Sequence, residues 1–161
     1  MDTPTTTLAQ NATPGSSATG ILDPAKPEHE KALRKLERDL IMWFTTTSTD
    51  GRPHAVPVWF FWHEGAVLVF SRAEAVKVKH VRRGSPVLVH LDAGKFGNDV
   101  VVLNGTAEVS RRPAAQWITE FRDAYASKYD EAIEEYGMSL DDITATFDTA
   151  IVFTPERVMA W

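Results

Sequence analysis

The sequence predicts one mainly β domain, in which about six antiparallel strands close into a barrel with a few peripheral helices. Runs of aromatic and β-branched residues recur along the chain, as expected of strands. Tight turns such as Asp50-Gly51 and Glu64-Gly65 join several of them, which indicates antiparallel neighbours. The chain has 161 residues, which suits a single core.

The first half of the chain gives a helix and then a three-strand meander. Pro27 suits the first position of a helix over 27–39, and Leu33, Leu36 and Leu40 form one apolar stripe. Strands are expected at 41–47, 52–63 and 66–71. Pro53 and Pro57 within the second strand predict an edge position or a bulge there.

The second half alternates strands with helices. A short basic helix is expected at 74–83, followed by strands at 86–91 and 99–109. Pro113 opens a helix to about residue 127, and short acidic helices continue to Phe147 as a solvated surface. The last strand comprises 150–153 and 157–161 and is expected to bend at Pro155.

The first 26 residues differ in composition from the rest. They are rich in Thr, Ala, Ser, Gly and Pro and contain no aromatic residue, so they cannot bury enough surface to offset the entropy of ordering. The sequence therefore predicts a disordered tail over 1–26 and one domain over 27–161.

Composition excludes several classes of function. The chain has no cysteine, which rules out disulfides, thiolate catalysis and cysteine-ligated metals. Its formal charge of −5 argues against a general nucleic-acid binder. No apolar run is long enough to span a bilayer and the first residues do not resemble a signal peptide, so we expect a cytoplasmic protein without membrane contact.

The segment from Phe70 to Arg83 concentrates positive charge in an acidic chain. A strand ends at Ser71, and five basic residues follow within the segment: Arg72, Lys77, Lys79, Arg82 and Arg83. Hydroxyl, guanidinium and ammonium donors beside the start of a helix can hold a phosphate. The alternative interpretation is a solvated basic face.

The sequence gives little support for a metal site, a hydrolase site or a nucleotide-binding loop. The five histidines lack the HxH or HxxxH spacing of metal ligands, so we expect no metal site. There is also no GxSxG, GxGxxG or Walker motif. His54 stands apart because it lies in a strand expected to line a pocket, where it could hydrogen-bond a cofactor ring or serve the fold.

The aromatic run Trp59-Phe60-Phe61-Trp62 is continuous rather than alternating. Its simplest interpretation is a strand buried on both faces, by the barrel core on one side and by a second subunit on the other. A barrel this small has more apolar surface than its own core can cover, so we expect a homodimer.

Three segments resemble a known family. The strand Asp50-Gly51-Arg52-Pro53-His54-Ala55-Val56-Pro57-Val58-Trp59, the strand and helix from Phe70 to Arg83, and the strand Asn104-Gly105-Thr106-Ala107-Glu108-Val109 are similar, in order and spacing, to the pyridoxamine-phosphate-oxidase-like proteins. The resemblance covers about residues 27–161 and implies a six-stranded antiparallel split β-barrel. His80, where the family often has Asn, and Gly84-Ser85-Pro86 depart from its pattern.

Within this family the chain looks most like the actinobacterial branch that uses coenzyme F420, a deazaflavin. The resemblance implies a homodimer with cofactor sites at the subunit interface. His54, Pro57 and Val58 would lie along the cofactor ring. The residues that would hold the phosphate and the oligoglutamate tail are Ser71, Arg72, Lys77 and Lys79.

The function implied is hydride transfer from reduced F420 to a small organic substrate, with no catalytic side chain assigned. An FMN-dependent oxidase or flavin reductase is the first alternative, because FMN would suit the same phosphate site. A protein that binds or sequesters a cofactor without turnover is the second. A purely structural dimer is the third, and the basic segment counts against it.

Overall fold

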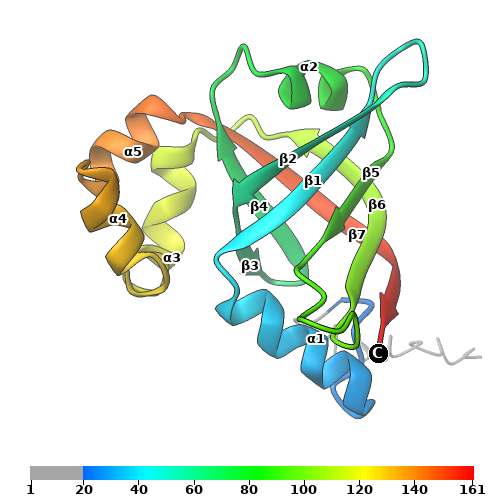
Figure 1. Cartoon of the computed structure of the whole chain (residues 1–161). Coiled ribbons are helices and arrows are strands. Elements are labelled where there is room, and N and C mark those ends of the chain that lie inside the picture. The colour runs from blue at the N-terminus through cyan, green and yellow to red at the C-terminus, as the bar shows by residue number, and fades with distance from the viewer. Residues whose placement is uncertain (1–19) are drawn as a thin grey trace, which may run out of the picture.

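A computed structural model describes residues 20–161 and shows a barrel with helices at its ends and on one side (Figure 1). The predicted mainly β class with peripheral helices is confirmed. The strands form one antiparallel sheet in the order β2-β1-β5-β6-β7-β4-β3. Their bounds are β1 Ile41–Thr47, β2 Pro53–Trp59, β3 Phe61–His63, β4 Ala66–Ser71, β5 Val87–His90, β6 Val101–Val109 and β7 Thr149–Ala160.

Within residues 20–161 the sheet has seven strands rather than six, because the expected strand 52–63 breaks at Phe60. The two pieces, β2 and β3, lie at opposite edges of the sheet. This one segment therefore passes from the first edge to the last and brings the sheet round into a barrel. Phe60 is fully buried, and the Tyr129 hydroxyl replaces its missing strand partner, accepting from its N–H at 2.8 Å and lying 2.7 Å from its carbonyl oxygen.

The expected bend at Pro155 is a β-bulge within a continuous strand β7. The pairing of β6 with β7 shifts register between Asn104 and Gly105, opposite Pro155. A Cβ atom at position 105 would lie 2.1 Å from the Thr154 carbonyl oxygen. Glycine is therefore the residue that lets the two backbones approach here.

Two helices close the ends of the barrel (Figure 1). Helix α1, Pro27–Arg38, lies across one end and helix α2, Val76–Arg82, across the other. Both insert apolar side chains into the core: Ala32, Leu33 and Leu36 from α1, and Val78 and Val81 from α2. Helix α2 is also fastened to β1 by a hydrogen bond between the buried side chains of Thr46 and His80, 2.8 Å long.

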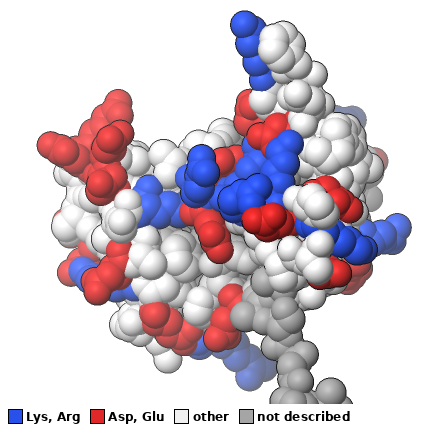
Figure 2. Space-filling model, turned by 90° about the horizontal axis from the view of Figure 1, so that it is seen from below, with Lys and Arg blue, Asp and Glu red and all other residues white. Residues whose placement is uncertain are grey.

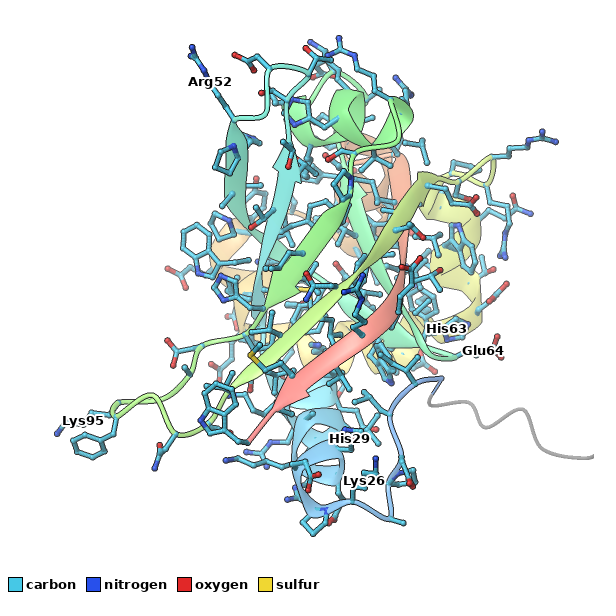
Figure 3. The ribbon with its side chains drawn as sticks, turned by 90° about the vertical axis from the view of Figure 1, so that its right-hand side faces the viewer. Lys26, His29, Arg52, His63, Glu64 and Lys95 are labelled. Carbon is cyan, nitrogen blue, oxygen red and sulfur yellow. The ribbon has the colours of Figure 1, made fainter. Side chains whose placement is uncertain are left out.

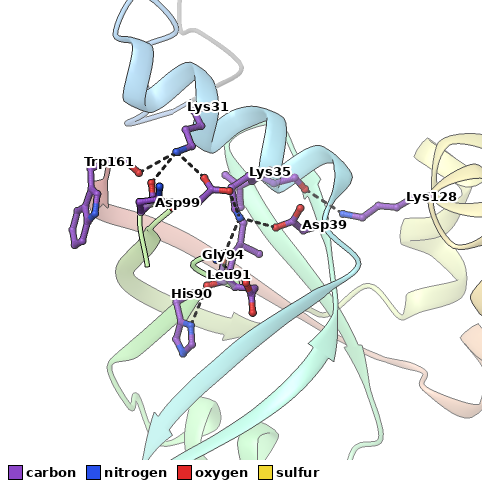
Figure 4. A network of polar contacts seen from close by, with 12 residues as sticks. Lys31, Lys35, Asp39, His90, Leu91, Gly94, Asp99, Lys128 and Trp161 are labelled. Carbon is purple, nitrogen blue, oxygen red and sulfur yellow. Dashed lines mark hydrogen bonds and ion pairs between the residues drawn. The ribbon is translucent and has the colours of Figure 1, made fainter. Parts of the chain in front are cut away.

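A polar network fixes α1 to the loop between β5 and β6 (Figure 4). Asp99 forms an ion pair with Lys31 at 3.0 Å and accepts a hydrogen bond from Lys35 at 3.1 Å, and Lys35 also pairs with Asp39 at 3.3 Å. Lys31 reaches the Trp161 carbonyl oxygen as well, at 3.4 Å. Seen from this end, basic and acidic side chains lie beside one another (Figure 2).

The other helices stand beside the barrel and join β6 to β7. They are α3 Ala114–Lys128, α4 Asp130–Tyr136 and α5 Leu140–Thr146. Helix α3 is kinked at Phe121, where φ is −141° and ψ is 28°. A second apolar cluster joins them to the outside of the barrel: Leu68, Ile118, Phe121, Tyr125, Tyr129 and Leu140. These helices therefore cover the outer face of β3 and β4, and they also contact Trp59 of β2 and Val152 of β7.

Within residues 20–161, no helix lies over the outer face of β1, β5 and β6 (Figure 3). Side chains alternate along β1, so that Met42 and Phe44 are buried while Ile41 and Trp43 are 43% and 41% exposed. None of the helices within residues 20–161 has the length and apolarity to cross a bilayer.

The expected tail, residues 1–26, falls mostly outside the described residues. Its last part, 20–26, is described, and Leu22 packs in the barrel core with 2% of its surface exposed. The Asp23 N–H donates to His29 Nδ1 at 3.0 Å. The packed part of the chain thus begins before the expected boundary at Pro27.

Candidate functional site

A cavity of about 280 Å³ lies between the barrel and the three helices beside it. The barrel contributes residues from β2, from β4 and from the turn into α2, and the opposite wall comes from α3, α4 and α5. The lining residues are Pro57, Val58, Trp59, Phe70, Ser71, Arg72, Ala75, Lys77, Tyr125, Tyr136, Ile143 and Phe147.

One end of the cavity carries two cations and a hydroxyl. Strand β4 ends at Ser71, the chain turns with a hydrogen bond from the Ala75 N–H to the Arg72 carbonyl at 3.1 Å, and α2 then begins. Across this turn, Ser71, Arg72 and Lys77 all contribute to the lining of the cavity. The sequence signal, a strand ending in Ser-Arg before a lysine-bearing helix, corresponds to this local geometry.

Lys77 is a half-buried ammonium that forms no ion pair with any described residue. Burial lowers its pKa, since desolvation disfavours the charged form. The Arg72 guanidinium lies over the Phe147 ring, 5.2 Å from its centroid, and Ser71 is buried. An anion bound here would give Lys77 the negatively charged partner that it lacks among the described residues.

The rest of the cavity is lined by aromatic and aliphatic side chains. Trp59 stacks on Tyr129, with centroids 4.7 Å apart and planes 10° apart, and meets Tyr136 edge-on at 6.0 Å. Pro57, Val58 and Phe70 continue the barrel wall. Such a surface suits a flat, apolar ring.

The structure brings together five of the seven predicted site residues: Pro57, Val58, Ser71, Arg72 and Lys77. The other two lie outside the cavity lining. His54 is half-buried, and its ring meets the buried His80 ring edge-on at 5.8 Å. Lys79 lies on the exposed side of α2. A role in binding stays a prediction for all seven.

The helical wall is the part of the site that sequence reasoning missed. Tyr136, Ile143 and Phe147 come from the acidic segment that was expected to be only a solvated surface. Its carboxylates are exposed, but apolar residues between them face the barrel. Tyr125 carried a signal, because it continues the helical spacing of Ile118 and Phe121.

Among the described residues, the cavity lining does not bring together the groups that a hydrolase or a metalloenzyme would need. The Ser71 hydroxyl donates to the Arg72 carbonyl at 3.3 Å, so no general base holds it. Among residues 20–161, no cluster of three or more His, Asp or Glu side chains could hold a metal ion. The arrangement can hold a ring at one end and an anion at the other.

Comparisons with known proteins agree with this description. Residues 27–161 match the sequence model of a family described as pyridoxamine 5'-phosphate oxidase. None of the curated proteins matches the chain significantly.

Several solved structures share the fold. One named F420 reductase has a TM-score of 0.62 at 16% identity, over 78% of this chain and 94% of that one. A conserved hypothetical protein of Mycobacterium tuberculosis has a TM-score of 0.64 at 18% identity, over 82% of each chain. A FAD-binding protein of Mesorhizobium loti has a TM-score of 0.57 at 18% identity, over 80% of this chain and 88% of that one.

Proposed function

The chain belongs to the pyridoxamine 5'-phosphate oxidase family, and from that premise we propose that it is an oxidoreductase that binds a flavin or deazaflavin in the cavity. The observation that carries the proposal is the half-buried Lys77 without an anionic partner, beside Arg72 and Ser71, at one end of an aromatic cavity. The ring would lie along Pro57, Val58 and Trp59, with the phosphate at the cationic end.

The residues fit such a cofactor in shape and in charge. A bound flavin or deazaflavin would supply hydride transfer to or from a small organic substrate, so the protein needs to bind, orient and exclude water. In this proposal Lys77 and Arg72 neutralise the phosphate, and the aromatic walls keep water from the ring. These roles agree with the cavity lining, because none of its described residues is a nucleophile hydrogen-bonded to a general base.

We favour F420 over FMN because of the charge on α2. Lys79, Arg82 and Arg83 are exposed and form no ion pair with any described residue. A row of free cations next to a phosphate site suits a cofactor with a polyanionic tail, and FMN has none. The similar fold of a protein named F420 reductase supports F420, and that of a FAD-binding protein supports the flavin alternative.

We also propose a homodimer with the cofactor site beside the subunit interface. An apolar stripe crosses the uncovered sheet face through Ile41 and Trp43 on β1, Val102 on β6 and Met159 on β7. Strand β5 lies between β1 and β6, and its His90 pairs with Trp43 on one side and with Val102 on the other. Pro57 lies opposite Trp43 in the β1–β2 pairing and also lines the cavity, so the cavity borders this stripe. A second copy on the stripe would cover apolar surface and adjoin the cofactor.

The size of the cavity agrees with a shared site. At about 280 Å³ it lies at the lower limit of the roughly 300–1,000 Å³ typical of ligand pockets. One chain would therefore enclose part of a flavin-sized molecule, and the partner would cover more of it.

The test is titration of the purified protein with F420 and, separately, with FMN, following cofactor fluorescence. We expect saturable binding of F420, tighter than that of FMN. Tighter binding of FMN would move the protein to the flavin-dependent side of the family. Binding of neither cofactor would contradict the proposed function.

A further inference from the structure

Tyr125 is a buried tyrosine whose hydroxyl has no partner within the described part of the chain. Only 3% of its surface is exposed, and it lines the cavity. Tyr129 lies one turn later on the same side of the helical wall, and its hydroxyl, in contrast, is fully hydrogen-bonded. Its hydroxyl lies within 2.8 Å of the Phe60 N–H nitrogen and within 2.8 Å of the carbonyl oxygens of Phe60 and Leu40.

The ring of Tyr125 is held by other rings. The centroids of Phe61 and Phe70 are both 5.8 Å away, and that of Tyr129 is 4.9 Å away. Phenylalanine would make the same ring contacts, so packing does not require the hydroxyl. The hydroxyl oxygen is not one of the fully enclosed side-chain atoms without a partner, so it keeps accessible surface at the cavity, where an acceptor on a bound molecule could pair with it.

The charge state of Tyr125 suits a donor. Burial raises the pKa of its hydroxyl, so the phenol keeps its proton throughout the physiological range. Of the other polar groups at the cavity, Ser71 already donates to a backbone carbonyl, Lys77 and Arg72 lie at the cationic end, and the Tyr136 hydroxyl belongs to a side chain that is 52% exposed. Tyr125 therefore supplies a neutral donor on the helical wall.

We propose that the Tyr125 hydroxyl donates a hydrogen bond to the carbonyl oxygen of a flat aromatic molecule held in the cavity beside Trp59 and Phe70. The inference deepens the proposed function and rests on it in taking this cavity as the ligand site. The carbonyl could belong to the ring of the cofactor or to the substrate, and the chemistry of recognition is the same.

A matched pair of probes tests the hydrogen bond. 2-Acetylnaphthalene carries a carbonyl on a flat bicyclic ring, and 2-ethylnaphthalene has nearly the same shape without it. Equilibrium dialysis with the cofactor-free protein gives the ratio of their dissociation constants, hydrocarbon over ketone. We expect Tyr125→Phe to lower this ratio about 3- to 10-fold, as for one lost neutral hydrogen bond.

Tyr136→Phe is the matched control, because it removes a hydroxyl from a tyrosine that also lines the cavity but is 52% exposed. We expect it to leave the ratio unchanged. An unchanged ratio in Tyr125→Phe, an equal fall in Tyr136→Phe, or no binding of the ketone by the unmodified protein would overturn the inference. An unchanged thermal unfolding midpoint shows that Tyr125→Phe is folded.

Repeating the dialysis at saturating FMN separates the two sources of the carbonyl. Ketone binding that persists, and still depends on Tyr125, assigns the hydroxyl to the substrate. Ketone binding that is lost by competition assigns it to the cofactor ring. If the ketone preference holds but neither F420 nor FMN binds, the proposed function fails while the hydrogen bond stands.

Discussion

At the scale of single residues, two neighbouring tyrosines predict opposite responses to the same substitution. Tyr129→Phe leaves the buried N–H of Phe60 without an acceptor at the break between β2 and β3. We expect it to lower the free energy of unfolding by about 1–3 kcal/mol. Tyr125→Phe removes a hydroxyl that has no described partner and should be neutral or slightly stabilising. Urea unfolding of both variants checks this, and equal losses would contradict it.

The cationic end of the site could be predicted from the sequence because it is local. Ser71, Arg72 and Lys77 are brought together by one strand end, one turn and one helix start. His54 was a weaker candidate, since a histidine in a strand serves a site or the fold with equal ease. Its observed neighbour is the buried His80.

The aromatic wall could not be predicted in the same way. Tyr136 and Phe147 lie more than 60 residues from β4 in the chain, and they reach the cavity only through the packing of α3, α4 and α5. The spacing of apolar residues shows that a helix is amphipathic, but it does not show which surface of the protein that helix covers.

At the scale of elements, the same limit explains the seventh strand. The run from Arg52 to His63 is continuous in strand-like composition, so nothing local marks Phe60 as a break. The break follows from the closure of the barrel, which gives β2 the partner β1 and β3 the partner β4. Pro57, which predicted an edge strand, does lie in an edge strand.

The link between α1 and the β5–β6 loop predicts a dependence on pH. The hydrogen bond from Lys31, aided by Lys35, holds the pKa of Asp99 below its ordinary value. A carboxyl group with a lowered pKa in the folded state stabilises the fold above the unfolded-state pKa of about 4, and this stabilisation is lost as the pH falls through the folded-state pKa.

Asp99→Asn should therefore reduce the stability at pH 7 by at most about 1 kcal/mol, since the pairs are partly exposed. The difference from the unmodified protein should be smaller at pH 3, below the unfolded-state pKa, than at pH 7. Urea unfolding at both pH values measures it, with Asp123→Asn as the control for an exposed carboxylate outside any described ion pair. A difference independent of pH would contradict the assignment.

At the scale of the whole molecule, the uncovered sheet face predicts association. Trp43→Asp places a carboxylate in the centre of the apolar stripe, where a partner would have to bury it. We expect the dimer dissociation constant to rise at least about 100-fold while the monomer stays folded. Sedimentation equilibrium measures this, and Thr119→Asp on the exposed side of α3 is the control. A stable monomer of the unmodified protein at micromolar concentration would contradict the interface.

The position of the stripe next to the cavity joins assembly to function. If the partner covers part of the cofactor, Trp43→Asp should weaken cofactor binding without a change in any cavity residue. In that case, cofactor binding depends both on the cationic end of the cavity and on dimerisation through the uncovered sheet face.

If the cofactor's phosphate lies at Lys77, a cycle of binding measurements with two ligands and three proteins will detect its contact with the ammonium. FMN and riboflavin differ by the phosphate alone. Lys77→Gln removes the half-buried charge, and Lys79→Gln makes the same change on the exposed side of α2. We expect Lys77→Gln to weaken FMN binding by about 1.5–3 kcal/mol and riboflavin binding hardly at all, with a smaller effect of Lys79→Gln. Equal losses for both ligands, or no loss for FMN, would contradict the phosphate site.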